Sequence, residues 1–221
     1  MAILFSEPQP VKKYVQPALK WPAVIFSYIF HPVFIPVYVI AFLVYVHPSY
    51  FSGFSEKKKL YTLIISGINL VFFPLFSIML LKPLGFIDSV FLRTRKDRII
   101  PYIISGIFYF WGYRVFNQQE MYPRVMSVFI FGIFIAVSAA LIANIYFKIS
   151  MHTIGMGGWL GIFWVIAKEN SMLMTWPLSL VFMITGIVCT SRLILSDHTQ
   201  KDIYAGLALG FLSQWISSFV N

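Results

Sequence analysis

The sequence predicts an all-α, polytopic helical membrane protein with about six to seven transmembrane helices in one bundle. Of its 221 residues, 59% are hydrophobic and 11% are charged, and the mean hydropathy is +0.79. Soluble domains contain about 25% charged residues, and several apolar runs here reach the roughly 20 residues that a helix needs to cross a bilayer. Long runs with weak alternation argue against a β-barrel. We therefore expect a multi-pass integral membrane protein, with a bacterial cytoplasmic membrane as the working assignment.

Seven apolar runs each predict one helix, with ends defined to within ~2–4 residues. They cover residues 22–46, 60–81, 99–116, 124–147, 153–168, 171–190 and 203–220. Pro32 and Pro36 predict a kink in the first run. The glycines of the fifth run predict close approach between helix backbones.

The domain organisation predicted is simple. Residues 1–21 lack the order of a signal peptide, because their basic residues follow the first apolar patch. We expect them to form an interfacial arm. Residues 22–221 then form a single transmembrane domain.

The parity of the runs places three polar segments on one face of the membrane. Seven crossings put the segments after the second, fourth and sixth runs on the same side as the N-terminus. These segments are 82–98, 148–152 and 191–202. Ionisable clusters at the ends of membrane helices suggest function, so we expect the three segments to form one composite site.

The positive charge does not fix the orientation of the chain. The formal net charge is +9, which in a membrane protein indicates membrane-flanking residues or contact with anionic headgroups, and not nucleic-acid binding. The N-terminal side carries eleven Lys and Arg and the other side six. Six of those eleven lie in the suspected site, where catalysis could explain them, so the side of the site stays undecided. Lys57, Lys58 and Lys59 are expected to be a solvated anchor.

The composite site has the chemistry of a phosphate site. Several cations converge there with two histidines, His152 and His198, and a guanidinium group matches phosphate oxygens. One histidine can attack phosphorus while the other protonates the leaving oxygen. Carboxylates are too few for a two-metal phosphatase, so we expect no cofactor and metal-independent hydrolysis. A single metal ion held by His152, His198 and Asp202 remains the alternative.

The histidines differ in their sequence context. His198 and Asp202 are four residues apart, so on a helix they share a face and the carboxylate can hold one imidazole proton. His31 and His47 stand beside prolines near the ends of the first run. We expect both of these to be structural or interfacial.

The motif residues resemble those of the type 2 phosphatidic acid phosphatase superfamily, which includes membrane lipid phosphatases. Its third signature is complete in Ser191-Arg192, five residues, His198, three residues and Asp202. Its second, Pro-Ser-Gly-His, is met in part by residues 149–152. Its first, a Lys, six residues and Arg-Pro, is degenerate around Pro101, where Arg93 takes the Lys position and Ile100 the Arg position.

The resemblance implies definite roles. His198 would be the nucleophile, Asp202 its orienting carboxylate, and His152 the general acid and later the base for water. Arg192 and Ser150 would hold the phosphoryl group, helped by the cluster that contains Arg95 and Arg98. The predicted phosphate-binding set is Arg192, Ser150, Arg98, Arg95, Lys148 and Ser191.

Two classes of function follow. The first is a lipid phosphatase acting through a phosphohistidine on a phosphate monoester or diphosphate, with a phospholipid or isoprenoid phosphate as substrate. Polyprenyl diphosphate, phosphatidylglycerol phosphate, phosphatidate and lipid A phosphates all fit. The second is a transporter or an anionic-lipid-binding membrane protein without enzymatic activity. The runs contain almost no buried ionisable residue of the kind that transport needs.

Overall fold

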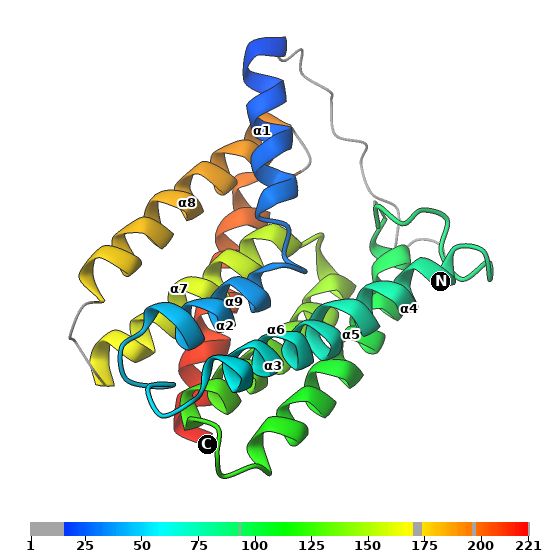
Figure 1. The fold of residues 1–221 in the computed structure, drawn as a ribbon. Coiled ribbons are helices and arrows are strands. Elements are labelled where there is room, and N and C mark those ends of the chain that lie inside the picture. The colour runs from blue at the N-terminus through cyan, green and yellow to red at the C-terminus, as the bar shows by residue number, and fades with distance from the viewer. Residues whose placement is uncertain (1–15, 93, 170–173, 196–197, 221) are drawn as a thin grey trace.

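The chain folds into a bundle of helices (Figure 1). The computed structural model describes residues 16–92, 94–169, 174–195 and 198–220, and this part of the chain contains no strand. In chain order the helices are α1 Pro17–Ile29, α2 Ile35–Ala41, the π-helix η2 Phe42–Val46, α3 Glu56–Gly67, the π-helix η3 Ile68–Phe72, α4 Phe73–Leu81, α5 Arg95–Asn117, α6 Arg124–Tyr146, α7 Met151–Glu169, α8 Thr175–Ile194 and α9 Gln200–Val220.

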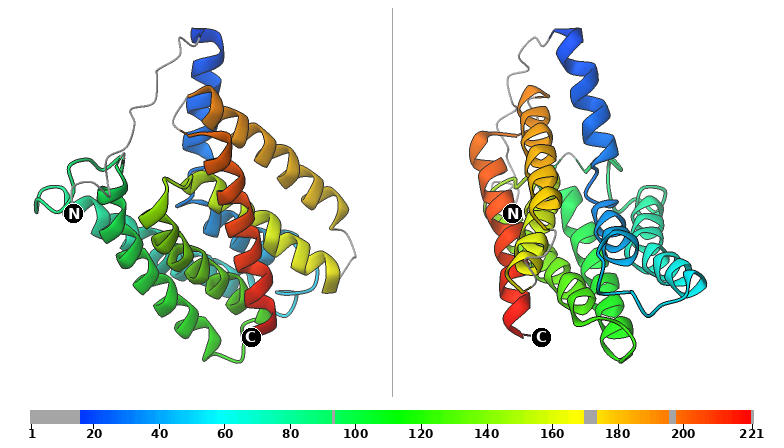
Figure 2. Two further views of the ribbon diagram at one scale, coloured as in Figure 1. Left: turned by 180° about the vertical axis from the view of Figure 1, so that it is seen from behind. Right: turned by 60° about the vertical axis from the view of Figure 1, so that its left-hand side comes forward.

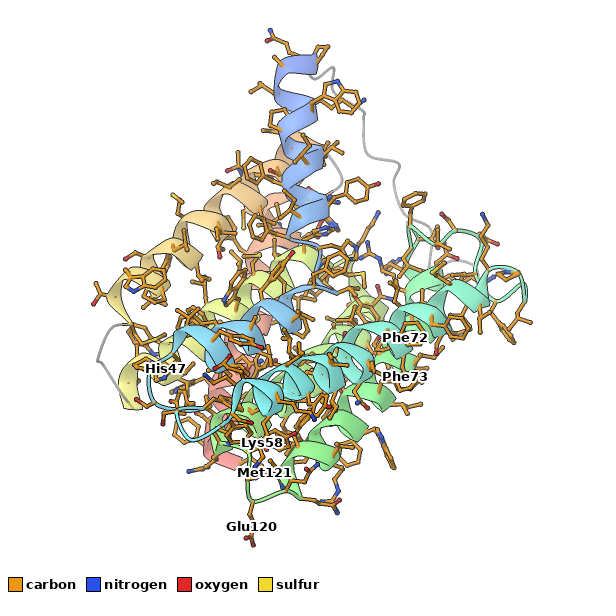
Figure 3. All side chains as sticks on the ribbon, viewed as in Figure 1. His47, Lys58, Phe72, Phe73, Glu120 and Met121 are labelled. Atoms are coloured by element: carbon orange, nitrogen blue, oxygen red, sulfur yellow. The ribbon has the colours of Figure 1, made fainter. Side chains whose placement is uncertain are left out.

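The predicted class, a helical membrane bundle, is confirmed. Five described helices are long and apolar enough to cross a bilayer: Glu56–Leu81, Arg95–Asn117, Arg124–Tyr146, Thr175–Ile194 and Gln200–Val220. Large apolar side chains cover their outer surfaces, among them Phe72 and Phe73, labelled in Figure 3. Lys58 and Glu120 lie at the end of the bundle opposite α1 (Figure 3), as expected for solvated residues at one membrane face.

The first apolar run, 22–46, is broken and not merely kinked. Helix α1 ends at Ile29, and α2 begins at Ile35. Pro32 has no N–H to continue the helix and disfavours helical geometry at His31. Pro36 stands in the first turn of α2, where a missing N–H costs nothing. Helix α1 also begins inside the expected 1–21 arm, and residues 1–15 of that arm lie outside the described residues.

The second span contains a local change of helix type that accommodates a proline. At the junction of η3 and α4 the N–H of Phe73 donates to the carbonyl of Ile68, five residues back. The next residue is Pro74, which has no N–H. A π-type turn at this point lets the helix continue through Leu81 without a clash between the ring and the preceding turn.

Helix α7 lies in the interior and packs most extensively on α9. Figure 2, seen from behind, shows α9 crossing α7 and α6. Three glycines allow the contact: a Cβ at Gly157 would collide with the carbonyl of Leu207, one at Gly210 with that of Ile154, and one at Gly206 with the Thr153 hydroxyl. Small residues at such crossings let two backbones touch. Close approach at the fifth run was therefore correctly expected.

This contact generates a stability prediction. Gly210→Ala forces α9 away from α7, so we expect a loss of about 1–3 kcal/mol, as for other overpacked sites. Gly186→Ala on α8 is the matched control, because no atom lies within 4 Å of its added Cβ and alanine favours a helix. Thermal unfolding in one detergent compares the two. Equal midpoints for both variants would contradict the packing assigned to Gly210.

Candidate functional site

The three predicted segments meet at one cavity. Its volume is about 600 Å³, and its lining includes Leu92 and Arg98 from the first segment, Lys148 and His152 from the second, and Arg192 and His198 from the third. We call the five ionisable residues Arg98, Lys148, His152, Arg192 and His198 the charged end of the cavity. The remainder of the cavity continues between α5, α6, α7 and α9.

His198 and Asp202 are positioned by the start of α9. Thr199 and Asp202 form a reciprocal cap: the Thr199 N–H donates to Asp202 Oδ2 at 2.8 Å, and the Asp202 N–H donates to Thr199 Oγ1 at 3.3 Å. Such a cap satisfies helix N–H groups and fixes both side chains. The same Oδ2 lies 3.7 Å from Nδ1 of His198. This separation is in the range of an ion pair and longer than a hydrogen bond.

Burial keeps His198 neutral. The His198 side chain is 3% exposed. Desolvation lowers the pKa of the imidazole from its ordinary value of 6.5, Asp202 raises it in part, and Arg98 and Arg192 lower it further. The net direction is downward, so at neutral pH the ring has an unprotonated nitrogen available as a nucleophile.

His152 lies across the cavity at the start of α7 and contacts α1. Its Nε2 is 3.1 Å from the backbone carbonyl of Ser27, so this nitrogen carries a proton that it donates to the carbonyl. Desolvation, followed by Arg192, holds the pKa of His152 well below its usual value. An anion bound beside Arg192 would offset that repulsion and raise the pKa. His152 is thus suited to hold a second proton only when an anion is present.

The charged end has the electrostatic character of an anion site. Arg98, Lys148 and Arg192 all line the cavity, and none of its described lining residues is Asp or Glu. Partly buried cations act through a low dielectric and attract an anion more strongly than surface cations do. The arrangement therefore fits a phosphate or another small anion.

Arg95 and Arg98, from the first segment, bind backbone carbonyls of other parts of the chain. Arg98 Nε donates to Leu92 O at 2.9 Å and its Nη1 to Ile149 O at 2.7 Å, which joins the first segment to the second. Arg95 Nη1 donates to Ile145 O and Tyr146 O, each at 3.2 Å. Arg95 therefore holds the C-terminus of α6 and does not line the cavity, unlike Arg98.

The two predicted serines and the remaining cations occupy different surroundings. Ser150 is fully buried, and its N–H donates to Asp202 O at 3.4 Å, which ties the second segment to the third. Ser191 Oγ donates to Ile187 O within α8. Neither serine is among the residues that line the cavity. Lys96 is exposed, and Arg93 lies outside the described residues.

Sequence reasoning missed the contribution of the N-terminal segment. Ser27, Tyr28 and His31 line the same cavity as the catalytic candidates. Arg192 Nη1 lies 3.5 Å from Ser27 Oγ, and the rings of His31 and His152 are 5.2 Å apart between centroids. The one available signal was His31 followed by proline, which predicts only a break in a helix.

The alternative of a single metal ion finds no support in the arrangement. Within the described ranges, no three His, Cys, Asp or Glu side chains are placed to share an ion. His152 points to Ser27, and Asp202 is engaged in the helix cap. Among the residues that the structure describes, none form a ligand set of the kind that catalytic zinc requires.

The backbone contacts of Arg95 generate a second prediction. Arg95→Ala leaves two carbonyls of α6 without their donor, so we expect a loss of about 1–3 kcal/mol of stability. Phosphate affinity should stay within about twofold, because Arg95 does not line the cavity. The exposed neighbour Lys96→Ala is the control and should change neither property. Thermal unfolding with and without inorganic phosphate measures both, and a selective loss of phosphate affinity in Arg95→Ala would return this residue to the site.

Comparison with known proteins agrees with the geometry of the C-terminal helices. Residues 144–220 match the sequence model of the PAP2 superfamily. The match contains the second and third signatures, with His152, Arg192, His198 and Asp202, and does not extend to the degenerate first signature. No curated protein and no solved structure gives a significant match. The resemblance seen in the motifs is thus supported over helices α7 to α9, where residues 144–220 are similar to the PAP2 superfamily.

Proposed function

We propose that this chain is an integral membrane lipid phosphatase. Its substrate would be a phosphate monoester or diphosphate of a membrane lipid, hydrolysed through a phosphohistidine without a metal ion. The family match and the five apolar helices support a membrane phosphatase. The lipid substrate, the histidine intermediate and the residue roles are the proposal.

The observation that carries the proposal is the proximity of His198 and Asp202 at the cationic end of the cavity. Asp202 is fixed by Thr199, and its Oδ2 lies 3.7 Å from His198 Nδ1. Arg192 and Lys148 line the same end of the cavity, and His152 faces it from α7. A nucleophile, an orienting carboxylate, an acid and phosphate-binding cations are therefore available together.

In the first step, the unprotonated Nε2 of His198 attacks phosphorus while its Nδ1–H is held by Asp202. The bond between phosphorus and the lipid oxygen breaks, and the leaving oxygen takes a proton from His152. Arg192 and Lys148 balance charge on the phosphoryl oxygens. The products of this step are the dephosphorylated lipid (or its monophosphate) and phosphohistidine 198.

In the second step, His152 is neutral and takes a proton from water as the water oxygen attacks phosphorus. The bond between phosphorus and Nε2 breaks, which releases inorganic phosphate and restores neutral His198. One residue thus acts as acid and then as base, which requires a pKa that responds to the bound anion. The position of His152 beside Arg192 supplies that response.

The form of the cavity favours a lipid over a soluble phosphate ester. Arg98 and Tyr109 both line it and lie on the same helix, α5. At 1.5 Å per residue the cavity extends ~17 Å along this helix. Apolar residues such as Phe129, Ile133 and Ile154 line the inner part. An extended chain of roughly a dozen methylene groups fits that length, with its phosphate at the charged end.

The nucleophile is tested directly. His198→Ala should lower phosphate release from detergent-solubilised lipid phosphates by more than ~10²-fold, given usual nucleophile and acid–base contributions. His47→Ala is the control, since His47 does not line the cavity. Turnover should survive a metal chelator. Chelator-resistant turnover by wild type that persists in His198→Ala would overturn the assignment.

The carboxylate has a separate test in the pH profile. Asp202→Asn can still accept the Thr199 N–H, so the helix cap remains, but the negative charge is lost. We expect kcat to fall by ~10-fold or more. The acid limb of kcat/KM should move to lower pH, because Asp202 raises the pKa of His198 and its removal lets the imidazole stay neutral in stronger acid. An unchanged acid limb would show that Asp202 only caps α9.

A transporter or anionic-lipid-binding protein is the other class of function. It predicts phosphate-lipid binding without release of phosphate. A panel of polyprenyl diphosphate, phosphatidylglycerol phosphate, phosphatidate and lipid A separates the classes and identifies the substrate. If wild type releases phosphate from none of these while binding them, the second class is favoured.

A further inference from the structure

His31 belongs to the wall of the cavity that the N-terminal segment supplies. It stands in the break between α1 and α2, at residues 30–34, and lines the cavity with Ser27 and Tyr28. This segment lies far outside residues 144–220, which carry the family match. The role of His31 therefore has to be argued from its own surroundings.

The backbone fixes the tautomer of His31. The N–H of Val33 donates to His31 Nδ1 at 3.4 Å. A neutral imidazole with Nδ1 as acceptor carries its proton on Nε2. Nε2–H is therefore the donor that the ring can offer to a ligand.

His47 makes the same backbone contact as His31 but does not line the cavity, so this contact alone does not place a histidine at the cavity. His47 also precedes a proline, and its Nδ1 accepts from the N–H of Ser49, again at 3.4 Å. Its ring stacks on Tyr50, with 4.2 Å between centroids, and is 5% exposed. Figure 3 shows it beyond η2, away from α1. The two histidines share a local motif, and only His31 faces the cavity.

The neighbours of His31 are the groups assigned to phosphate chemistry. Its ring meets that of His152 edge-on, at 5.2 Å between centroids. Ser27, one turn earlier, accepts a hydrogen bond from His152 through its carbonyl and lies beside Arg192 through its hydroxyl. The end of α1 thus brings His31 to the same place as His152 and Arg192. The lining there is cationic and, in the described residues, free of Asp and Glu.

We propose that His31 is a phosphate-binding residue, whose Nε2–H donates to an oxygen of the phosphoryl group held by Arg192 and Lys148. The inference rests on the proposed function for the identity of the substrate, but the anion itself is inferred from the charged end alone. His31 then supplies a neutral donor among cations. It positions the phosphoryl group toward His198 without taking part in the transfer of a proton.

The test compares two replacements of His31. In His31→Gln, the side-chain amide can place an N–H donor near the position of Nε2. In His31→Phe, the ring shape is kept and the donor is lost. His47→Phe is the matched control, because it makes the same change in the same His-Pro motif at a site away from the cavity.

The measurement is binding of inorganic phosphate and of orthovanadate to each detergent-solubilised protein, by calorimetry, together with KM and kcat for a lipid phosphate. We expect His31→Phe to weaken anion binding roughly tenfold, as for the loss of one hydrogen bond to a charged group. His31→Gln should stay within about threefold of wild type. His47→Phe should match wild type.

Each other outcome is decisive. If His31→Phe binds the anions with wild-type affinity, the proposal is overturned. It is also overturned if His31→Phe and His31→Gln lose anion affinity equally while unfolding at the wild-type temperature, since that pattern indicates an effect of packing. If wild type hydrolyses the lipid phosphate and His31→Phe changes neither anion affinity nor KM, this inference is wrong while the proposed phosphatase function stands. If anion binding depends on His31 but wild type hydrolyses no lipid phosphate, the inference is supported and the proposed phosphatase function is wrong.

Discussion

The backbone contact between α7 and α9 is the constraint on which the site depends. Gly157, Gly206 and Gly210 let the two helices touch, and any side chain there would separate them. The contact brings the start of α7 against the start of α9, where the Ser150 N–H donates to Asp202 O. His152 at the start of α7 and His198 just before α9 therefore reach one cavity. In a bilayer, where apolar lipid gives little drive for helices to associate, this kind of close packing provides the attraction.

Much of the architecture was predictable because it depends on local chemistry. Run lengths and composition gave the helical membrane class, and the parity of the runs placed residues 82–98, 148–152 and 191–202 together. The spacing of His198 and Asp202 predicted their proximity on the expectation that both lie on one helix. In the structure α9 begins at Gln200, so His198 lies just before the helix, and the cap between Thr199 and Asp202 holds the carboxylate near the imidazole. These inferences need only the period of a helix and the thickness of a bilayer.

The sequence did not predict which group each cationic side chain contacts. Arg95 and Arg98 occur in one charged cluster, yet Arg95 binds the end of α6 whereas Arg98 lines the cavity while binding two carbonyls. Carbonyls at a helix end compete with phosphate for a guanidinium group, and sequence does not show which carbonyls lie within reach. The break at Pro32 was underestimated for a similar reason: a kink and a full break share the same proline signal, and only packing separates them.

The bond between His152 and the carbonyl of Ser27 makes the site a product of two distant parts of the chain. The partners are 125 residues apart in the sequence. The carbonyl belongs to the last turn of α1, where carbonyl groups have no N–H partner within the helix. A transplanted C-terminal half would therefore carry His152 and His198 but lack the cavity wall that α1 supplies. Exchange of this site with a relative would have to include α1 and α5 as well as α7 to α9, because Ser27 of α1 binds His152 and Arg98 of α5 lines the same cavity.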